Sequence, residues 1–340
     1  MQTLHIVIDK PRSALVLQRE LTSDGPGPDE LLIRTGYTFI STGTELSIYT
    51  AADVRVFEPG SWCSYPHRAG YANAGTVVAA GENVREFAPG DRVFTAGPHA
   101  SHFICNRGQL ILKVPDAIDS RTAAAARMAG VAMTAPLFAP PVFDTLVVVT
   151  GLGVVGNCAA QIYRAMGCRV IGVDPVAHRR EIAAACGIDA VLDPETDDIA
   201  GEIEKRNDGH PADICVESTG MSSVILETHR YVGRKGRIVL LGTPREPFTG
   251  EVTGFFQNVQ RKNIAVFGAF EHCLPVHGHD REDASMSGKF TKVFGLIGQQ
   301  RIHLEPLISH TIRPGDIGMA YEGLLNRPDE WTGVAIDWTG

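Results

Sequence analysis

The feature that most constrains this chain is a glycine pattern at residues 151–156, Gly-Leu-Gly-Val-Val-Gly. An apolar run, LVVVT at 146–150, comes directly before it, and a stretch with helical spacing of its apolar residues begins at 154 and extends to 167. The run predicts a buried strand, and the stretch predicts a helix. Glycines between a strand and a helix let backbone N–H groups approach a pyrophosphate at the helix N-terminus, so the pattern predicts a dinucleotide-binding turn.

Each glycine has its own part in such a turn. Gly151 permits the tight bend, Gly153 lets the backbone approach the pyrophosphate, and Gly156 permits close packing of the helix on the sheet. We assign the other residues of the loop to the same cofactor-binding site: Leu152, Val154 and Val155.

An acid stands where the cofactor ribose would be bound. Asp174 ends the next predicted strand, RVIGVD at 169–174, roughly 20 residues beyond the glycines, where a carboxylate accepts hydrogen bonds from the adenosine ribose. The same charge repels the 2′-phosphate of NADP, so we expect NAD as the cofactor. Arg179 and Arg180 follow closely and are the residues that would bind a 2′-phosphate, but their place on a helix favours a solvated face.

Two later strands end in turns at the same edge of the predicted sheet. Thr219 follows the strand ADICVES, 212–218, and Gly242 and Thr243 follow GRIVLL, 236–241. Ligands of open parallel sheets bind at the carboxyl ends of the strands. We therefore include Thr219, Gly242 and Thr243 among the cofactor-binding residues, although any glycine-containing turn that leaves a strand has the same signature.

Strands and helices alternate from about residue 141 to residue 270, which predicts an α/β protein with a doubly wound parallel sheet of the Rossmann type. Residues 1–140 differ, because short β-branched runs there are broken by glycine and proline about every ten residues, as in a β-rich barrel. The last segment, 271–340, has a helical stretch at 289–301 and strand-like runs that do not extend the alternation. We assign it to the barrel, so the Rossmann domain is inserted in the chain.

Composition excludes several classes of partner. The formal net charge is −8, which gives no electrostatic footprint for a nucleic acid or an anionic membrane. There is no apolar run of about 18 residues, and the alternating, charged N-terminus reads as a strand and not as a signal peptide. The seven cysteines are scattered without a C-x-x-C pair, as is usual for reduced thiols. We expect a cytoplasmic protein that acts on a small molecule.

Several short motifs follow the order found in one known family. They are Thr42-Gly43-Thr44-Glu45, Gly75-Thr76-Val77-Val78, Pro89-Gly90-Asp91-Arg92-Val93 and Trp331-Thr332-Gly333-Val334. With these motifs and the glycine pattern, the chain resembles the medium-chain dehydrogenase/reductase superfamily over essentially its whole length. The resemblance implies a GroES-like catalytic domain at 1–140, completed by 271–340, a Rossmann domain at 141–270, and a homodimer formed through the edge strand near 263–270.

The zinc-binding positions of that superfamily carry other residues in this chain. The resemblance places Thr42, Tyr71 and Ala129 where zinc alcohol dehydrogenases have three ligands, and a catalytic zinc needs three protein ligands. Only Cys105 remains in the segment that corresponds to the structural-zinc lobe, 94–109. We therefore expect no metal. The resemblance is to the zinc-independent branches, which include bacteriochlorophyllide dehydrogenases and dehydrogenases of sugar and aminoglycoside pathways.

Without a metal, the proton of an alcohol must leave through ordinary acid–base groups. Thr44 matches the family hydroxyl that contacts the alcohol oxygen or the nicotinamide ribose, and the phenol of Tyr71 can relay a proton or merely fill space. Glu45 matches a carboxylate that is usually paired with a basic residue. His99 and His102 lie on a predicted strand and point to opposite faces, so one can face the cofactor as a base, unless both are structural. The catalytic candidates are Thr44, Tyr71, His99 and Glu45.

A loop rich in histidine and acids, 271–284, follows the Rossmann domain. The spacing of His272, Cys273, His277 and His279 matches no structural zinc pattern, so we expect a polar loop that contacts the substrate and not a metal site. The acids of this loop and the overall negative charge would suit a cationic aminosugar.

The sequence thus favours an NAD-dependent, zinc-independent dehydrogenase that oxidises a secondary alcohol of a sugar, aminoglycoside or cyclitol to a ketone, as in antibiotic biosynthesis. We expect the active site in the cleft between the domains, where water is excluded. Three alternatives stay open. They are an NADPH-dependent quinone or enoyl reductase, which would have a neutral or basic residue in place of Asp174, a bacteriochlorophyllide-type alcohol dehydrogenase, and a protein that binds NAD(H) without catalysis.

Overall fold

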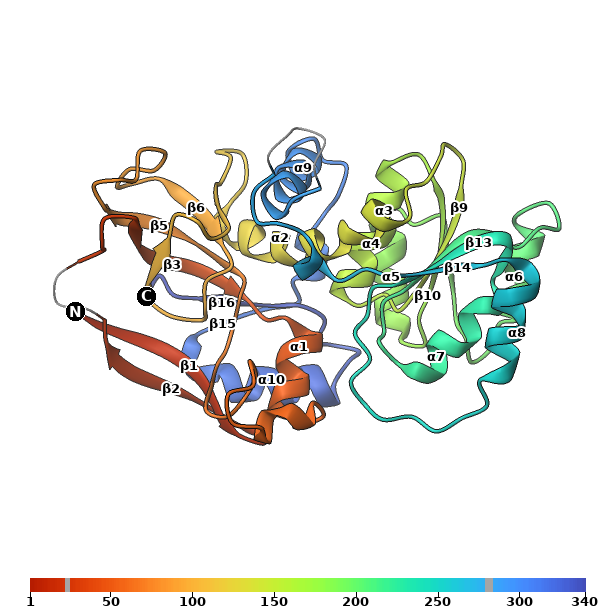
Figure 1. The fold of residues 1–340 in the computed structure, drawn as a ribbon, viewed down its shortest axis with the longest axis horizontal. Helices are drawn as coiled ribbons and strands as arrows, with labels where there is room; N and C mark the ends of the chain where they lie inside the picture. The colour runs from red at the N-terminus through yellow and green to blue at the C-terminus, as the bar shows by residue number, and fades with distance from the viewer. Residues whose placement is uncertain (22–24, 279–283) are drawn as a thin grey trace. The chain divides into compact units, whose positions relative to one another are not determined.

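The structure, a computed structural model, describes residues 1–21, 25–278 and 284–340. The chain divides into two compact units, whose elements are labelled in Figure 1. The residues of each unit are as follows: the barrel unit has Met1–Arg127, Leu274–Gly298 and Ile308–Gly340, and the nucleotide unit has Met128–Cys273 and Gln299–Leu307. None of the helices in the described ranges is long and apolar enough to span a membrane.

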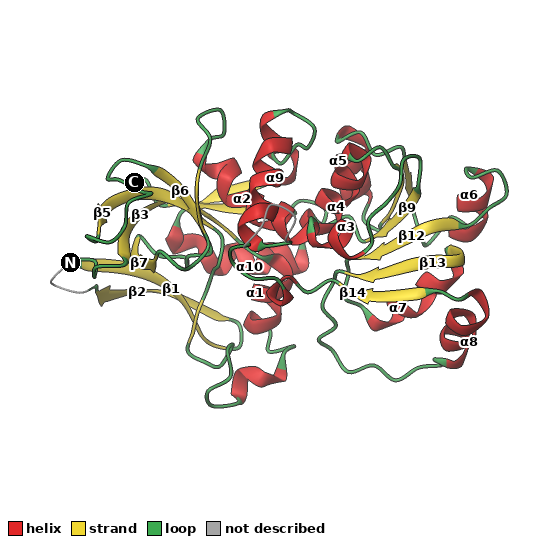
Figure 2. Ribbon diagram, turned by 45° about the horizontal axis from the view of Figure 1, so that its top comes forward, coloured by secondary structure: helices red, strands yellow, loops and turns green. Residues whose placement is uncertain are grey.

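The nucleotide unit is a parallel sheet with helices on both faces. Its strands are β9 (Leu146–Thr150), β10 (Arg169–Val173), β11 (Ala190–Leu192), β12 (Ala212–Glu217), β13 (Val232–Leu240) and β14 (Ala265–Gly268). The main helices are α3 (Thr134–Phe138), α4 (Val154–Ala165), α5 (Ala177–Ala185), α6 (Ile199–Lys205), α7 (Ser222–Glu227) and α8 (Thr253–Lys262). Figure 2 shows α4 and α5 on one face of the sheet and α7 and α8 on the other.

The strand order of this sheet is β11-β10-β9-β12-β13-β14, and all neighbouring strands are parallel. This is the order of a doubly wound dinucleotide-binding fold, so the predicted α/β fold with a Rossmann-type sheet is confirmed. The prediction succeeds because the central strand β9 is covered on both faces. Its residues Val147, Val148 and Val149 have no exposed surface, and such strands read as unbroken β-branched runs.

The barrel unit contains two sheets in its described part. Their strands are β1 (Gln2–Lys10), β2 (Ser13–Glu20), β3 (Glu30–Phe39), β4 (His67–Arg68), β5 (Asn73–Ala80), β6 (Arg92–Thr95), β7 (His102–Asn106), β8 (Ile111–Lys113), β15 (His310–Ile312) and β16 (Val334–Asp337). The larger sheet has the order β15-β16-β3-β5-β6-β8 with β7 on β3, and the smaller has the order β2-β1-β4. Because β16 pairs with β3, the last segment of the chain completes this unit.

Four α-helices accompany these sheets. They are α1 (Thr42–Tyr49), α2 (Ser120–Ala132), α9 (Met286–Gly298) and α10 (Ile317–Asn326). Only α9 was expected, as the stretch at 289–301. The short helix α1 carries the Thr-Gly-Thr-Glu motif, and it packs on α10 through the rings of Tyr49 and Tyr321, whose centroids are 4.9 Å apart. These rings belong to a buried cluster that also includes Ile6, Ile48 and Trp331.

Candidate active site

The glycine loop joins β9 to α4 and leaves the N-terminus of the helix open. Gly151 has φ +85°, a left-handed conformation that glycine adopts without strain. Gly153 is the N-cap of the twelve-residue helix, no side chain caps it, and a Cβ placed on Gly153 would meet nothing within 4 Å. The first N–H groups of α4 therefore lack side-chain partners and have space beside them for an anion.

Gly156 is where this helix comes closest to the sheet. A Cβ on Gly156 would overlap the carbonyl oxygen of Gly151 and the hydroxyl of Ser218. The side chains of Leu152 and Val154 are buried, so the loop presents mainly backbone at its open side. These features fit a diphosphate that is held by N–H groups and not by side chains.

Asp174 lies directly after β10 and is anchored to the glycine loop. Its carboxylate accepts hydrogen bonds from the N–H groups of Leu152, at 2.7 Å, and Val176, at 2.8 Å, and the residue is 1% exposed. A carboxylate has about four acceptor positions, so it retains capacity for ribose hydroxyls.

The two arginines after Asp174 correct an expectation, because neither lies on a solvated face. Arg180 forms an ion pair with Asp193 at 2.9 Å and donates to the carbonyl oxygen of Asp174 at 2.7 Å. Nη1 of Arg179 is 3.7 Å from the Asp174 carboxylate, and its Nε is buried without a hydrogen-bond partner among the described residues. Acids and carbonyls at the strand ends draw both side chains inward, which helical position alone does not reveal.

The turns after β12 and β13 lie beside the glycine loop, as the parallel topology predicts. Cγ2 of Thr219 would be 2.7 Å from a Cβ on Gly151. A Cβ on Gly242 would overlap the backbone of Gly220, and the backbone of Thr243 packs on the same residue. The sheet edge thus brings Thr219, Gly242 and Thr243 together with the loop, while their contact with a cofactor stays a prediction.

Glu217 organises this edge of the sheet and was not expected from the sequence. The residue ends β12 and is fully buried. Its carboxylate accepts hydrogen bonds from the N–H groups of Thr219, at 2.7 Å, and Gly220, at 3.1 Å, and from the hydroxyl of Thr219. Burial raises the pKa of Glu217. The available signal was an acid that directly follows the apolar run Ile214-Cys215-Val216.

A second polar cluster lies in the barrel unit and contains all four catalytic candidates. Thr44 is in the first turn of α1, and Tyr71 lies between β4 and β5. The hydroxyl of Tyr71 donates to Oγ1 of Thr44 at 3.3 Å and is within hydrogen-bond distance of Oγ of Ser41. Thr44 and Tyr71 are partly exposed, whereas Ser41 is buried. The cluster is therefore a chain of hydroxyls that includes Ser41, a residue not expected from the sequence.

Glu45 and His99 form the buried part of the cluster. Nε2 of His99 is 3.0 Å from Oε2 of Glu45, and the Tyr321 hydroxyl donates to the same oxygen at 2.7 Å. Oε1 accepts the N–H of Ser41 at 2.7 Å. The expectation that Glu45 is paired with a basic residue is confirmed. The prediction that His99 lies on a strand with His102 is wrong, because β7 begins at His102. His99 is in the segment before that strand and is 0% exposed.

The pKa of Glu45 is lowered although burial alone would raise it. Desolvation opposes the charge, but the charge of His99 and hydrogen bonds from His99, Tyr321 and Ser41 outweigh it. His67, on β4, feels the same carboxylate: burial lowers the pKa of His67, and Glu45 acts in the opposite direction. Glu45 is therefore a buried anion at neutral pH.

Arg127, a second residue missed in the sequence, packs against Tyr71. Its guanidinium carbon is 4.7 Å from the centroid of the Tyr71 ring, and its Nε donates to the Tyr71 carbonyl oxygen at 3.2 Å. Arg127 is 2% exposed. The buried guanidinium thus holds both the ring and the backbone of Tyr71.

None of the three residues that the resemblance places at zinc-ligand positions has a usual zinc-binding group. Thr42 has an alcohol, Tyr71 a phenol engaged with Ser41 and Thr44, and Ala129 a fully buried methyl group, and none is a thiolate, imidazole or carboxylate. In the part of the chain that the structure describes, no three His, Cys, Asp or Glu side chains are grouped so as to hold a metal ion.

The loop predicted to contact the substrate, 271–284, is described only in part. Residues 279–283, which include His279 and Asp280, lie outside the described residues. Cys273 is exposed, and the ring of His272 is 5.0 Å from that of Phe270. Substrate contact by this loop stays a prediction.

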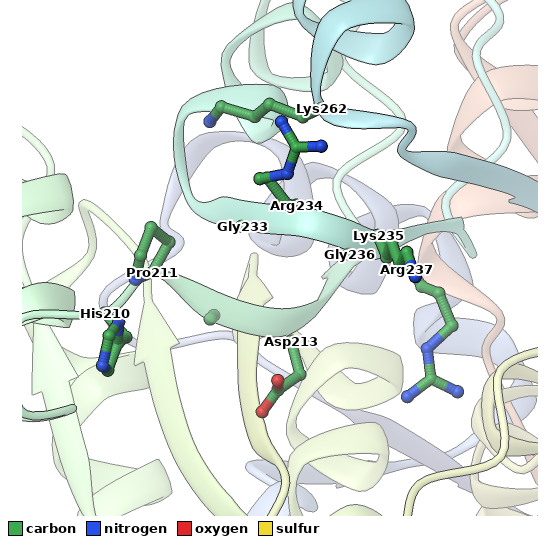
Figure 3. A pocket seen from close by; sticks show the side chains of 10 residues that line it. His210, Pro211, Asp213, Gly233, Arg234, Lys235, Gly236, Arg237 and Lys262 are labelled. Carbon is green, nitrogen blue, oxygen red and sulfur yellow. The ribbon is translucent and has the colours of Figure 1, made fainter.

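A hollow of about 500 Å³ lies at the other edge of the sheet, near the amino ends of β12 and β13 (Figure 3). Its charged lining residues are His210, Asp213, Arg234, Lys235, Arg237 and Lys262. Lys262 donates to the carbonyls of His229 and Val232, and Arg237 donates to that of Pro140. In Figure 3 the charged side chains point in several directions and not toward one point, so we do not assign this hollow to the site.

Two family comparisons match the two units. Residues 27–134 match the alcohol dehydrogenase GroES-like domain, and residues 154–277 match the zinc-binding dehydrogenase family. The chain belongs to the medium-chain dehydrogenase/reductase superfamily, as its motifs predict.

Individual relatives are remote. The D-guloside 3-dehydrogenase of Shigella flexneri is 29% identical over 229 residues, which span 62% of this chain and just under two thirds, 65%, of that protein. The L-threonine 3-dehydrogenase of Caldanaerobacter subterraneus subsp. tengcongensis is 26% identical over 84% of this chain and 85% of that protein. An Escherichia coli oxidoreductase/dehydrogenase of unknown specificity has a similar structure, with a TM-score of 0.84 at 20% identity over 99% of both chains.

The buried Glu45 predicts a loss of stability in acid. Because its folded-state pKa lies below the ordinary value of 4.5, its stabilisation is present above that pH and is lost as the pH falls through the folded value. Glu45→Gln should therefore melt at a lower temperature than the wild type near pH 7, and the gap should narrow below pH 4.5. Thermal unfolding followed by circular dichroism at several pH values measures the difference in melting temperature. The control is Glu20→Gln, at an exposed residue. A gap that does not change with pH contradicts the prediction.

Proposed function

We propose that this protein is an NAD-dependent dehydrogenase that oxidises a secondary alcohol of a polyhydroxylated substrate to a ketone without a catalytic zinc. The observation that carries the proposal is the cluster of hydroxyls that Thr44, Tyr71 and Ser41 form. The resemblance assigns the position of Tyr71 in this cluster to a zinc ligand. The names of the guloside and threonine dehydrogenases support oxidation of CH–OH as the reaction class.

The nucleotide unit would hold the cofactor. The backbone of 151–156 would bind the pyrophosphate, Asp174 the adenosine ribose, and the turns at Thr219, Gly242 and Thr243 would lie alongside. Bound NAD supplies the carbon that accepts a hydride from the substrate. The carboxylate of Asp174 supports NAD, because two backbone N–H groups fix a negative charge where NADP would bring its 2′-phosphate.

The barrel unit would handle the substrate hydroxyl and its proton. Thr44 and Tyr71 are the partly exposed members of the cluster, so we assign to them the hydrogen bonds to the alcohol oxygen. Arg127 holds Tyr71 in place. Glu45 and His99 are too deeply buried to touch a substrate, and we give them a positioning role in place of the catalytic one expected from the sequence.

The substrate class is the most specific part of the proposal. We propose a sugar, aminoglycoside or cyclitol of a natural-product pathway, such as antibiotic biosynthesis, in the cytoplasm. The relatedness to a guloside dehydrogenase supports a polyhydroxylated compound. The net charge of −8 favours a neutral or cationic one.

Turnover with NAD tests the proposal. Reduced-nicotinamide absorbance should rise when the protein meets NAD and a polyhydroxylated alcohol, and a chelator should not change the rate. NADH should form faster than NADPH because of Asp174. Loss of activity with chelator overturns the zinc-free assignment. Consumption of NADPH with quinones or enones, without alcohol oxidation, indicates a reductase, and cofactor binding without turnover indicates a non-catalytic protein.

Asp174→Asn should change cofactor preference. Loss of a charge-assisted hydrogen bond to the ribose weakens NADH binding roughly ten- to hundredfold, whereas NADPH loses little because the repulsion disappears as well. Fluorescence titration of both cofactors measures the ratio of the two dissociation constants. The control is Asp208→Asn, at an exposed residue with φ +51°, a conformation that asparagine tolerates. An unchanged ratio contradicts the role of Asp174.

We also propose a homodimer formed through β14. Ala265, Val266 and Gly268 are exposed on this edge strand, and an exposed apolar edge is a template for pairing with another chain. Light scattering should give twice the monomer mass. Val266→Lys should lower the mass toward that of the monomer, while Val78→Lys, at an exposed position of β5, should not. A monomeric wild type contradicts the proposal.

A further inference from the structure

The hydroxyl of Ser41 does not do what an N-cap serine usually does. Ser41 is the N-cap of α1, a position where serine normally accepts a hydrogen bond from an N–H of the first turn. No such bond forms here. Instead Oγ of Ser41 lies within hydrogen-bond distance of the Tyr71 hydroxyl. The helix thus gives up a capping interaction worth about 1 kcal/mol, and the hydroxyl is directed at Tyr71.

The backbone of Ser41 is held independently of its side chain. Its N–H donates to Oε1 of Glu45 at 2.7 Å, and Oε2 of Glu45 is held by His99 and by Tyr321, which is on α10. These groups are all buried. The position of the Ser41 hydroxyl is therefore set by a network that reaches α10, and not by solvent.

We propose that Ser41 is a positioning residue that donates its hydrogen bond to the Tyr71 oxygen and so makes Tyr71 the proton acceptor of the reaction. The proposal rests on the proposed dehydrogenase function. In this arrangement Ser41 donates to a lone pair of the Tyr71 oxygen. The O–H group of Tyr71 then donates to Oγ1 of Thr44, at 3.3 Å. The order of donation is Ser41 to Tyr71 to Thr44.

For the proton balance, the hydrogen bond between Tyr71 and Thr44 reverses once Tyr71 has lost its proton, while the bond from Ser41 keeps its direction. Tyr71 enters as the phenolate, after solvent water has taken its proton. The O–H bond of the alcohol breaks, its proton moves to Oγ1 of Thr44, and the former Thr44 proton moves to the Tyr71 oxygen. A bound NAD would accept the hydride from the alcohol carbon. Thr44 thus gains one proton and loses one, and Tyr71 becomes neutral. Release of the Tyr71 proton to water completes the cycle.

The charged groups around Tyr71 come from several elements. Arg127, on α2, places its guanidinium carbon 4.7 Å from the ring centroid. Glu45, on α1, lies behind Ser41, and His99 and His67 surround that carboxylate. The guanidinium of Arg127 is therefore the charged group that these contacts place against the ring.

Ser41→Ala tests the proposal, because it removes the hydroxyl and keeps the N–H that binds Glu45. We expect the acid limb of the kcat/KM profile to move up by about one pH unit, the effect of one hydrogen bond to a charged group. Near neutral pH, kcat/KM should fall about tenfold, while the affinity for NADH stays unchanged. Ser41→Thr should restore the profile. Thr50→Ala, which removes a hydroxyl bonded to the Leu46 carbonyl at the other end of α1, is the control.

A second measurement needs no substrate and so separates this proposal from the proposed function. Tyrosinate absorbance is titrated in the wild type and in Tyr71→Phe, and the difference isolates Tyr71. The titration is repeated with Ser41→Ala and with the double variant Ser41→Ala/Tyr71→Phe. The absorbance difference between these two proteins should appear at higher pH than the difference between the wild type and Tyr71→Phe. If it does, while no alcohol is oxidised, the positioning role stands and the function fails. If the titration and the pH profile are both unchanged, Ser41 has no such role.

Discussion

The barrel unit depends on one buried charge. The carboxylate of Glu45 has almost no contact with solvent, and an unpaired charge in that position would be expensive. Four groups from different parts of the chain meet it: the N–H of Ser41, the ring of His99, the hydroxyl of Tyr321 and, at longer range, His67. Loss of any one of these contacts reduces the compensation of a buried charge, so the segment before α1, the approach to β7 and helix α10 are held in one arrangement.

The nucleotide unit follows a different principle. Its binding loop depends on the absence of side chains: Gly151 supplies a backbone conformation, Gly153 leaves space, and Gly156 allows the helix to touch the sheet. The acid groups next to the loop, Asp174 and Glu217, both accept hydrogen bonds from backbone N–H groups and thereby shape the turns. Backbone geometry shapes each of these turns, and the parallel order of the strands then brings the turns together at one edge of the sheet.

This difference explains what the sequence could predict. The strand-loop-helix around 151–156, the position of Asp174 and the neighbouring turns are local patterns, and the structure places them as expected. Helix α2 was missed because most of its residues are buried and give no alternation of apolar and polar positions. Helix α1 was missed because its buried residues include the polar Glu45 and Ser47. Ser41, Arg127 and Tyr321 were missed because their partners are 30 or more positions away in the chain, at Tyr71 or Glu45, and no spacing rule connects them. The pairing of Glu45 came from family resemblance, whereas its partner His99 needed the fold.

The anchoring of Asp174 bears on how cofactor preference can evolve in this chain. The carboxylate bonds the N–H of Leu152 in the glycine loop and the N–H of Val176 ahead of α5, so the group that would discriminate between dinucleotides also closes the turn that binds them. A small or basic residue at this position would admit a 2′-phosphate and at the same time release two backbone donors. A small or basic residue at this position would therefore need a second substitution that supports the loop, and without it both cofactors are expected to bind poorly. Asparagine keeps one acceptor oxygen and is the milder change.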